Sequence, residues 1–351
     1  MSRPLGHKVS CARVYWSVDA VTSDMSAILF IKTSSFGDVI HMMPALSDAR
    51  RALPNAHLAW VVDESYAPLV RLHPAVDEVL PISWRRWRRR LHSPSAWREM
   101  LAFSRGLRSR RYDAVVDTQG LIHSACIARL AIGRRHGYDV ASIRESLATS
   151  LYDVQHAISP NLSAIERNRR LTGAAVGYSP SGAINYGLFR PGQADRRGPA
   201  YALLVHATAR AEKNWPEASW IEIGQRLSRL GFEIVLPSGS AAEHTQAVRI
   251  AAGVRSATAP DSMSLDRVVR LVAGASLVVG VDTGLLHLGV ALGVPTVAIF
   301  AASNPALTGP RGHVAIEIVA SRPGPATADE VIAAVDRVLD RAPSRVSAGR
   351  R

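Results

Sequence analysis

The chain has 351 residues, of which 47% are hydrophobic and 20% charged. This excludes an intrinsically disordered protein and fits two globular domains, since a domain usually has roughly 100–200 residues. The 42 Lys and Arg residues outnumber the 29 Asp and Glu residues, and the formal net charge of +13 indicates an anionic partner such as nucleic acid, an acidic membrane surface or a phosphorylated substrate. Two cysteines far apart, Cys11 and Cys126, predict neither a disulfide framework nor a zinc site and fit a reducing cytoplasm.

The first half of the chain alternates short apolar runs with helical patterns. Residues 1–24 lack the apolar stretch of a signal peptide and are expected to be a poorly ordered extension. The apolar run at residues 27–32 predicts a buried strand, and a helix is predicted from about Val39 to Leu53. Further strands, separated by helices, are predicted at residues 56–62, 78–81 and 113–117. The alternation predicts a parallel sheet in a first domain of residues 25–190.

A basic segment, residues 84–111, begins at Trp84 and ends at Arg111. It contains ten arginines, one acid and four aromatic residues. Arginines interleaved with tryptophans favour contact with an anionic membrane surface. They would also suit nucleic acid, although no nucleic-acid-binding motif accompanies them, and a merely solvated basic helix is the remaining alternative.

A second α/β pattern begins near Tyr201 and predicts a second domain of residues 200–341. Residues 191–199, rich in Pro, Gly and charge, are predicted to be the linker. Pro216 is expected at the first position of a helix that ends near Leu230. The strands of this domain are predicted at residues 201–206, 233–237, 277–281 and 296–300.

A C-terminal helix is predicted to run to about Arg341. Thr327 and Glu330 have the spacing of a capping box at its start. We expect this helix to pack back on the first domain, and residues 342–351 to form a flexible tail.

Residues 271–310 form a long apolar stretch with one formal charge, Asp282. Glycines and Pro295 divide the stretch into pieces shorter than the ~20 residues that a membrane-spanning helix needs. The pattern therefore predicts strand, turn, helix and strand, all buried. Two consecutive βα units place a ligand cleft at the carboxyl ends of both sheets. Neither G-x-G-x-x-G nor a Walker A motif is present, which argues against a dinucleotide dehydrogenase and a P-loop enzyme.

Asp282 is the strongest single indication of a site, because a buried acid is costly unless its charge is satisfied. It ends a predicted strand and precedes Thr283, Gly284 and a helix, whose free N–H groups would suit a phosphate. Glycine at 284 would let a phosphate approach the backbone, and His287 lies within the first turn. The alternative is that Asp282 only caps the helix.

Lys213 is one of three lysines among 42 basic residues, which suggests a site that needs a compact ammonium. Lys32 ends a predicted strand and Lys213 lies in the loop after one, which are positions where a diphosphate would be placed. Asp38, at the start of a helix, could accept a proton from an attacking hydroxyl or simply cap that helix. Glu243 could bind a ribose, although acids are common at helix starts in any case.

Several other polar residues are expected to face the same cleft. Ser35 lies in a hydroxyl-rich loop, and Asp117 and Gln119 follow a predicted first-domain strand. An anionic acceptor would meet the basic segment, with Arg134, Arg135 and Arg144 as further candidates. Lys213 and the helix start at Thr283 can neutralise a leaving diphosphate, so no metal ion or other cofactor is expected.

Four ordered segments carry a resemblance to a known family: ILFIKTSSFGDVIHMMPAL, YDAVVDTQGLIHSA, LLVHATARAEKNWP and VVGVDTGLLHLGVAL. They resemble the lipopolysaccharide heptosyltransferase I family from residue 25 to the C-terminal helix. The resemblance implies an α/β GT-B fold, with two Rossmann-like domains facing across a cleft. It also implies inverting, metal-independent transfer of heptose from ADP-heptose to a Kdo residue of Kdo-lipid A, at the cytoplasmic face of the inner membrane.

The resemblance also implies roles for individual residues. Asp38 corresponds to the catalytic base. The donor site corresponds to Thr208, Lys213, Glu243, Asp282, Thr283, Gly284 and His287. Two positions depart from the family pattern: Ala209 replaces a threonine, and AASNP at residues 301–305 replaces Gly-Pro-Thr-Asp-Pro. These departures concern the identity of the donor more than the fold.

Three alternatives remain beside this interpretation. The chain could be a sister heptosyltransferase that adds the second heptose, although the KTSS start favours the first-heptose enzyme. It could be a sugar-nucleotide epimerase of similar fold, or a non-catalytic adaptor that binds a nucleotide or lipid. An Asp38→Ala variant that binds donor but does not transfer would support an enzyme.

Overall fold

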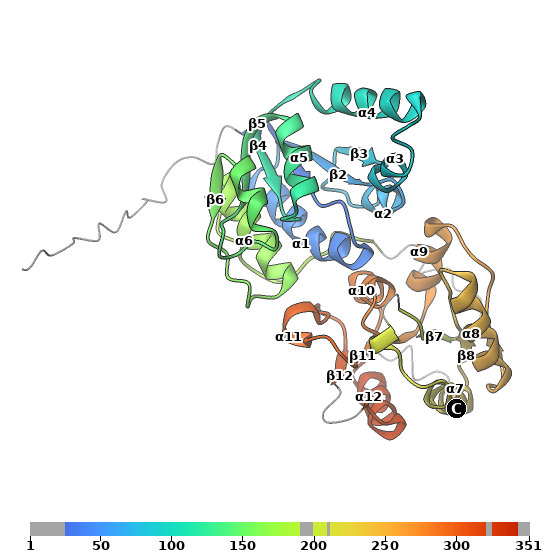
Figure 1. The fold of residues 1–351 in the computed structure, drawn as a ribbon. Helices are drawn as coiled ribbons and strands as arrows, with labels where there is room; N and C mark the ends of the chain where they lie inside the picture. The colour runs from blue at the N-terminus through green and yellow to red at the C-terminus, as the bar shows by residue number, and fades with distance from the viewer. Residues whose placement is uncertain (1–24, 190–198, 209–210, 321–324, 343–351) are drawn as a thin grey trace, which may run out of the picture.

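The computed structural model describes residues 25–189, 199–208, 211–320 and 325–342. These residues form two lobes, each built around a six-stranded sheet whose strands are all parallel (Figure 1). The predicted extension at residues 1–24, most of the predicted linker at 191–199 and most of the predicted tail at 342–351 lie outside the described residues.

The first sheet has the strand order β3-β2-β1-β4-β5-β6. Its strands are β1 (Ala27–Ile31), β2 (His57–Asp63), β3 (Glu78–Ile82), β4 (Arg111–Asp117), β5 (Ile132–Tyr138) and β6 (Val154–His156). Its helices are α1 (Phe36–Ala52), α2 (Ala67–Val70), α3 (Trp84–Arg88), α4 (Pro94–Leu107), α5 (Ile122–Leu130) and α6 (Ala164–Val176), with a 3₁₀ turn at Ser146–Leu151.

Alternate residues of β1 explain how the helices cover this sheet. Ile28 and Phe30 point to the face covered by α1 and α6, whereas Leu29 and Ile31 point to the face that α3, α4 and α5 cover. All five residues of β1 are buried, as expected for a central parallel strand with helices on both faces.

The second sheet has the strand order β12-β11-β10-β7-β8-β9. Its strands are β7 (Tyr201–Val205), β8 (Glu233–Val235), β9 (Ala257–Thr258), β10 (Leu277–Val281), β11 (Thr296–Phe300) and β12 (Ile316–Ala320). Its helices are α7 (Glu217–Arg229), α8 (Ala241–Ala252), α9 (Leu265–Gly274), α10 (Gly284–Ala291), α11 (Pro305–Thr308) and α12 (Ala328–Arg341), with a 3₁₀ turn at Ala211–Lys213.

Both sheets have the doubly wound order in which the direction of winding reverses between the first and fourth strands of the lobe. The reversal falls between β1 and β4 in the first sheet and between β7 and β10 in the second. Ligands of such sheets bind at the carboxyl ends of the strands beside this switch point. The loops that follow these four strands are therefore the expected site.

The two lobes share one continuous apolar core. Helix α1 packs against α10, and α2 packs against α9 (Figure 1). Gly284, the first residue of α10, lies so close to α1 that an added Cβ would be 2.9 Å from the backbone nitrogen of Gly37 and 2.5 Å from the ring of Phe36. Gly284 thus permits a backbone-to-backbone contact between the lobes.

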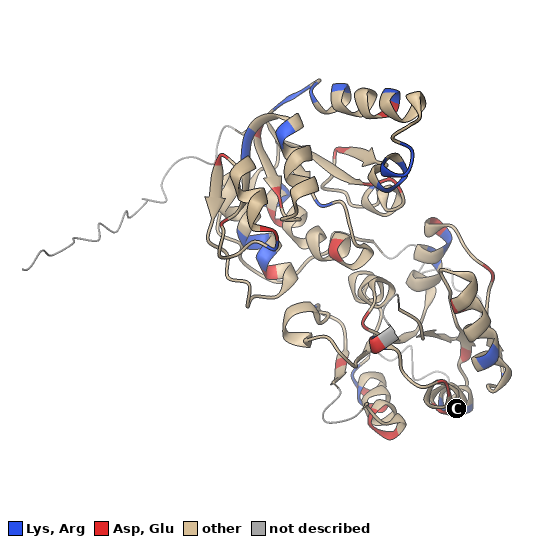
Figure 2. Ribbon diagram, in the orientation of Figure 1, with Lys and Arg blue, Asp and Glu red and all other residues tan. Residues whose placement is uncertain are grey.

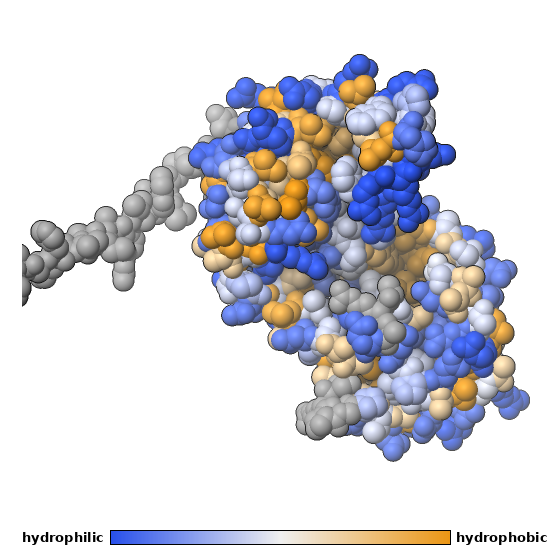
Figure 3. Space-filling model, viewed as in Figure 1, coloured by the Kyte–Doolittle hydropathy of each residue, from blue (hydrophilic) through white to orange (hydrophobic). Residues whose placement is uncertain are grey.

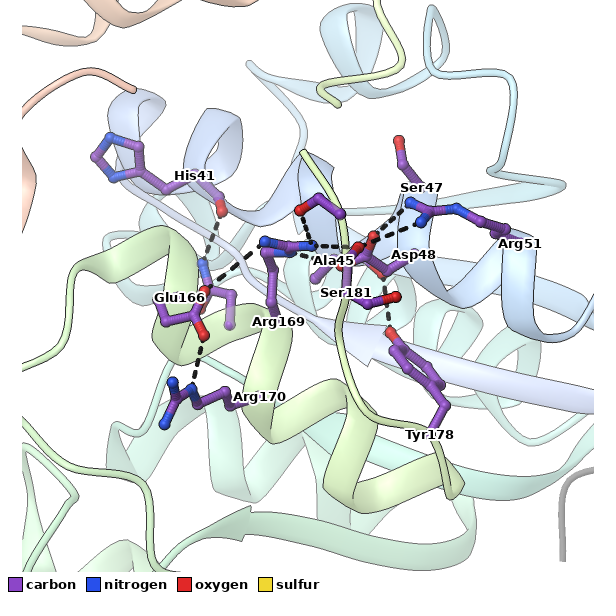
Figure 4. Close-up of polar contacts among 12 residues, drawn as sticks. His41, Ala45, Ser47, Asp48, Arg51, Glu166, Arg169, Arg170, Tyr178 and Ser181 are labelled. Atoms are coloured by element: carbon purple, nitrogen blue, oxygen red, sulfur yellow. Dashed lines mark hydrogen bonds and ion pairs between the residues drawn. The ribbon is translucent and has the colours of Figure 1, made fainter. Parts of the chain in front are cut away.

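Helix α1 is also fixed to its own lobe by α6, through the contacts drawn in Figure 4. Arg169 donates from Nε to the Asp48 carboxylate at 2.6 Å, and both side chains are buried. Asn168 donates from its amide to the backbone carbonyl of His41 at 3.0 Å, while the His41 ring points away from this cluster. A buried, fully paired network of this kind holds a helix in one position.

The structure confirms most of the predicted elements and corrects some of them. The apolar stretch at residues 271–310 forms β10, α10 and β11, and no described helix has the length and apolarity to cross a membrane. Helix α1 begins at Phe36 rather than near Val39, and Pro216 precedes α7 at the capping position. Strands β5, β6, β9 and β12 were not predicted.

The expectation that the C-terminal helix packs on the first domain is wrong. Helix α12 packs on β11, β12 and α7 of the second sheet. Its buried residues Val331, Val335 and Val338 join the core on the face of that sheet that α7 and α8 cover, away from the first lobe. The Thr327–Glu330 capping box is confirmed.

Candidate functional site

Asp38 lies in the first turn of α1, directly after the loop that follows β1. Its Oδ2 accepts hydrogen bonds from the backbone N–H of Ser35 at 2.8 Å and from the Ser35 hydroxyl at 3.0 Å. Burial alone would raise the pKa of Asp38, but the Lys32 ammonium and the Ser35 donors outweigh it, so the pKa of this carboxyl is lowered. Asp38 is therefore an ionised, half-buried carboxylate that also closes the first turn of its helix.

Lys32 does not face a diphosphate, contrary to expectation. Its side chain is buried beneath the loop and donates to the carbonyl of Thr118 at 2.9 Å. Burial lowers the pKa of Lys32, while the carboxylates of Asp38 and Asp117 oppose that effect. Lys32 thus acts as a buried counter-charge to Asp38.

Gln119 ties the end of β4 to the loop that carries Ser35. Its Oε1 accepts from the backbone N–H groups of Thr33 at 3.2 Å and Ser34 at 3.3 Å. Its side chain is half-buried at the carboxyl edge of the sheet, where a ligand can reach it. Gln119 and Ser35 therefore lie together, as expected.

Asp117 is fully buried, with none of its surface exposed. Its two oxygens accept from Tyr152 Oη and Ser124 Oγ, both at 2.7 Å, and from the backbone N–H of Gln119 at 2.8 Å. Burial raises the pKa of Asp117 despite these donors. In this structure Asp117 shapes the turn that presents Gln119 and is not open to an acceptor.

The three candidate arginines fall in different places. Arg134 and Arg135 lie in the amino-terminal half of β5, away from the carboxyl edge of the sheet, and Arg135 forms an ion pair with Asp153. Arg144 is exposed and close enough to Lys32 to lower its pKa. The structure thus brings Arg144, but not Arg134 or Arg135, near the loop of Asp38.

Arg167, on α6, was not among the predicted site residues. Its guanidinium lies over the ring of Tyr138, 4.4 Å from the centroid, and its charge also lowers the pKa of Lys32. Its Nε is buried without a hydrogen-bond partner among the described residues. No sequence pattern marks this arginine, since 39 of the 42 basic residues are arginines.

Asp282 is the centre of the polar cluster in the second lobe. Its Oδ2 accepts from Lys213 Nζ at 2.6 Å and from Ser303 Oγ at 2.5 Å, and its Oδ1 is 3.2 Å from His287 Nε2. Burial would raise the pKa of Asp282, but the hydrogen bonds from His287, Lys213 and Ser303 hold it well below the usual range. The interpretation of Asp282 as a helix cap is wrong, because Thr283 occupies that position.

Ser303 explains one departure from the family pattern. It lies in the AASNP segment, where the pattern has threonine, and it still supplies a hydroxyl to Asp282. Asn304 accepts from the backbone N–H of Ala306 and caps α11. The other departure, Ala209, lies outside the described residues.

The remaining predicted donor residues flank this cluster. Thr208 follows β7 and is half-buried, as are Thr283 and Gly284 at the start of α10. Glu243 lies in the first turn of α8, where its Oε2 accepts from the backbone N–H of Gly239 at 2.7 Å. Among the described residues no three His, Cys, Asp or Glu side chains gather as metal ligands.

The two halves of the site meet through a pair of histidines. His41, one turn after Asp38 on α1, has its Nε2 3.3 Å from Nδ1 of His287 on α10. The charges of both Asp38 and Asp282 act on His41, so both carboxylates lie close to it. The acid of the first lobe and the acid of the second therefore flank one interlobe contact, as the predicted mechanism requires.

The basic segment forms α3, α4 and the chain leading into β4. Arginines gather on α3 in Figure 2, and Figure 3 shows hydrophilic surface there beside the hollow between the lobes. A depression of about 610 Å³ beside α3 is lined by Asp63, Glu64, Ser65, Ser83, Arg85, Arg86, Arg89 and Arg90. It does not include Asp38 or Lys213, but it borders the same edge of the first sheet, since Asp63 donates to the carbonyl of Thr33.

The segment also exposes large apolar side chains. Trp97 and Leu101 of α4 are each 53% exposed, and Leu91 is 50% exposed. Trp84 stacks on His123, which contacts the Thr33 hydroxyl at 3.3 Å. The surface thus combines arginines with exposed apolar groups. It is connected to the loop that carries Ser35 through the contacts of Trp84 with His123 and of His123 with Thr33.

Comparisons with known proteins identify the family and the fold. Residues 100–331 match glycosyltransferase family 9 (heptosyltransferase). Lipopolysaccharide heptosyltransferase 1 of Salmonella typhimurium is 41% identical over 81% of this chain and 91% of its own length, and that of Pseudomonas aeruginosa is 41% identical over 83% of each chain. The solved structure of Escherichia coli heptosyltransferase WaaC with ADP has a TM-score of 0.83 and 38% identity, covering 88% of this chain and 99% of that one. The predicted GT-B fold is confirmed.

Proposed function

The chain belongs to glycosyltransferase family 9, the heptosyltransferases, and from that premise we propose that it transfers L-glycero-D-manno-heptose from ADP-heptose to a Kdo residue of Kdo-lipid A, with inversion. It is a heptosyltransferase of lipopolysaccharide core biosynthesis. One observation carries the proposal furthest: the charges of a carboxylate on α1 and of a buried acid that holds a lysine at a helix start both act on His41, which makes the interlobe contact with His287.

We propose a single displacement in which Asp38 is the base. Asp38 takes the proton of the acceptor hydroxyl, whose oxygen attacks the anomeric carbon as the bond from that carbon to the diphosphate breaks. The electron pair leaves on ADP. The lowered pKa of Asp38 keeps it ionised at neutral pH, so it is ready to accept the proton.

On the donor side, Lys213 and the start of α10 would neutralise charge on the departing diphosphate. Lys213 is only 16% exposed, and its pairing with Asp282 holds the ammonium beside the N-terminal turn of α10. Fixed charges of this kind act mainly in the transition state. We propose Thr208, Thr283 and Gly284 as the backbone and hydroxyl contacts of the diphosphate, and Glu243 as the ribose contact.

On the acceptor side, Ser35, Gln119 and Arg144 are the proposed contacts near the reacting hydroxyl. Arg167 joins them, because its Nε is buried without a hydrogen-bond partner among the described residues and its charge acts on Lys32. The arginine-lined depression beside α3 would receive the anionic groups of the acceptor, since guanidinium pairs well with carboxylate and phosphate.

We also propose that α3 and α4 bind the anionic cytoplasmic face of the inner membrane. The exposed Trp97, Leu91 and Leu101 lie among arginines, which is the composition of a helix that lies in a membrane interface. The acceptor carries a lipid, so this surface would bring the site to it.

The test uses the purified protein with ADP-heptose and Kdo-lipid A, with and without EDTA, and mass spectrometry of the product. The expected result is a mass gain of one heptose in both conditions, and no gain would contradict the function. Transfer only to an acceptor that already bears one heptose would favour the second-heptose enzyme. Asp38→Ala should bind ADP-heptose normally but lose about 10²–10⁴-fold in rate, whereas unchanged function in cells would favour an adaptor.

A further inference from the structure

A series of hydrogen bonds joins the two lobes through residues 246 positions apart in the chain. His41 of α1 contacts His287 of α10 at 3.3 Å, and the two rings meet edge to face with centroids 4.4 Å apart. His287 in turn contacts Asp282 at 3.2 Å. All three side chains are buried, so no bulk water competes for these bonds.

The positions of the ring protons determine which group donates and which accepts in each of these hydrogen bonds. Asp282 is ionised and can only accept, so His287 donates to it from Nε2. Nε2 of His41 in turn donates to Nδ1 of His287. This leaves the Nδ1 of His41 without a proton, which agrees with its lack of a hydrogen-bond partner among the described residues. The opposite tautomer would bury an unpaired N–H group at that atom, at a cost.

Surrounding groups keep His41 neutral. Burial lowers the pKa of His41 to about 3, with the Lys32 charge adding to the lowering and the charges of Asp38 and Asp282 opposing it. His41 therefore stays a neutral ring with a single N–H donor near neutral pH.

The backbone of His41 is also fixed. Its carbonyl accepts from Asn168 on α6, and Asp48, two turns further along α1, is paired with Arg169. Asp38 precedes His41 by three residues, so both project from the same side of α1. A shift of the His41 ring relative to the second lobe is therefore accompanied by a shift of Asp38.

We propose that His41 is a positioning residue of the transfer reaction, orienting His287 across the lobe interface and so setting Asp282 relative to Asp38. This inference rests on the proposed function. His41 acts through His287 and touches neither donor nor acceptor. Without the N–H donor of His41, the His287 ring is free to turn and the two lobes are less firmly fixed relative to each other. Lys213 and Ser303 still bind Asp282.

The kinetic signature of this role differs from that of a merely structural residue. A displacement of about 1 Å at a reacting group can cost about 10²-fold in rate. We expect His41→Leu, which keeps the bulk but removes the donor, to lower kcat about 10- to 100-fold while ADP affinity changes less than about threefold. We expect His41→Gln, whose amide N–H can replace the Nε2–H group, to recover most of kcat.

A matched control separates positioning from loss of stability. His73 is a buried histidine of the same lobe that bonds Ser47 and the backbone of Ala75. We expect His73→Leu to lower the melting temperature about as much as His41→Leu but to keep wild-type kcat. ADP binding and circular dichroism verify that each variant is folded.

A double-mutant cycle then tests whether His41 acts through its partner. In a His287→Gln background, His41→Leu should lower kcat by less than about twofold further, because the same interaction is already lost. The inference is overturned if His41→Leu keeps wild-type kcat, if His41→Gln is no better than His41→Leu, if His73→Leu loses as much rate, or if the two substitutions are additive. A wild-type protein without transfer activity would overturn the proposed function instead.

Discussion

Gly284→Ala tests the backbone contact between the lobes. The new Cβ would lie 2.9 Å from the backbone nitrogen of Gly37 and 2.5 Å from Cδ1 of Phe36. The Phe36 ring can turn, although it stacks on Tyr66 with centroids 5.6 Å apart. The Gly37 backbone cannot, because it lies in the first turn of α1.

The structure sets the size of the expected effect. Ordinary carbon contacts are about 3.5 Å or more, so α1 and α10 must separate by roughly 0.6 Å to relieve the contact with Gly37. This separation moves Asp38 away from the donor cluster around Asp282. With about 10²-fold lost for 1 Å, we expect kcat to fall roughly 10- to 50-fold. Crowding should also destabilise the protein by about 1–2 kcal/mol, partly offset because alanine favours the helix over glycine.

The assay combines initial transfer rates, ADP affinity by calorimetry and thermal unfolding. Gly289→Ala is the matched control on the same helix, because its Cβ would crowd only Val278 within the second lobe, at 3.0 Å. We expect this control to lose stability and to keep kcat within about threefold.

Two results would refute the reasoning. Wild-type kcat in Gly284→Ala would mean that the lobes do not need this contact during turnover. A large loss of ADP affinity with unchanged kcat would mean that Gly284 acts only as the proposed diphosphate contact, and that its close approach to α1 does not affect the transfer step.

Three further outcomes follow from the same contacts. Lys213→Ala should lower kcat about 100-fold, which corresponds to a barrier higher by about 3 kcal/mol, because it removes the charge that stabilises the departing diphosphate and leaves Asp282 without its cation. The change in KM for the donor should be smaller. Steady-state kinetics over a range of donor concentrations measures both kcat and KM. Ser303→Ala should raise the donor KM and lower the melting temperature, while Ser303→Thr should match the wild type, since either hydroxyl can donate to Asp282; equal kinetics of the two variants would count against this. The pKa of His41 is lowered to about 3, so between pH ~6.5 and ~3 the unfolded chain binds a proton that the folded chain does not, and stability falls as the pH falls, by at most about 1.4 kcal/mol per unit from this group. Urea unfolding between pH 7 and pH 5 should show a shallower slope in His41→Gln, and an unchanged slope would show that His41 titrates normally.

Local patterns in the sequence were sufficient to predict the central elements. The strands β1, β2, β7, β10 and β11 are continuous apolar runs, because both faces of a parallel sheet are covered. Strand β5 was missed because its sequence IGRRHGY contains two charges and two glycines, and only its last three residues are buried. Strand β6, with three residues, is too short to give a pattern.

Single residues were predicted where burial made their charge costly. Asp282 stood out as the one acid in a long apolar stretch, and Asp38 stood out by its place at a helix start. Asp117 is also an acid at the end of a strand, yet its carboxylate is buried inside the lobe and accepts hydrogen bonds from Tyr152 and Ser124. The sequence alone could not separate an acid that faces a ligand from one that faces the core.

The pattern of apolar runs and strand-end polar residues thus determined the two α/β lobes and the acids at their switch points, because each depends on neighbours close in the chain. Only the tertiary structure decided which polar groups meet: His41 with His287, Ser303 with Asp282, and Lys32 with the underside of the Asp38 loop. These pairs depend on how segments from distant parts of the chain pack together, and a local sequence pattern does not show which distant segments will be in contact.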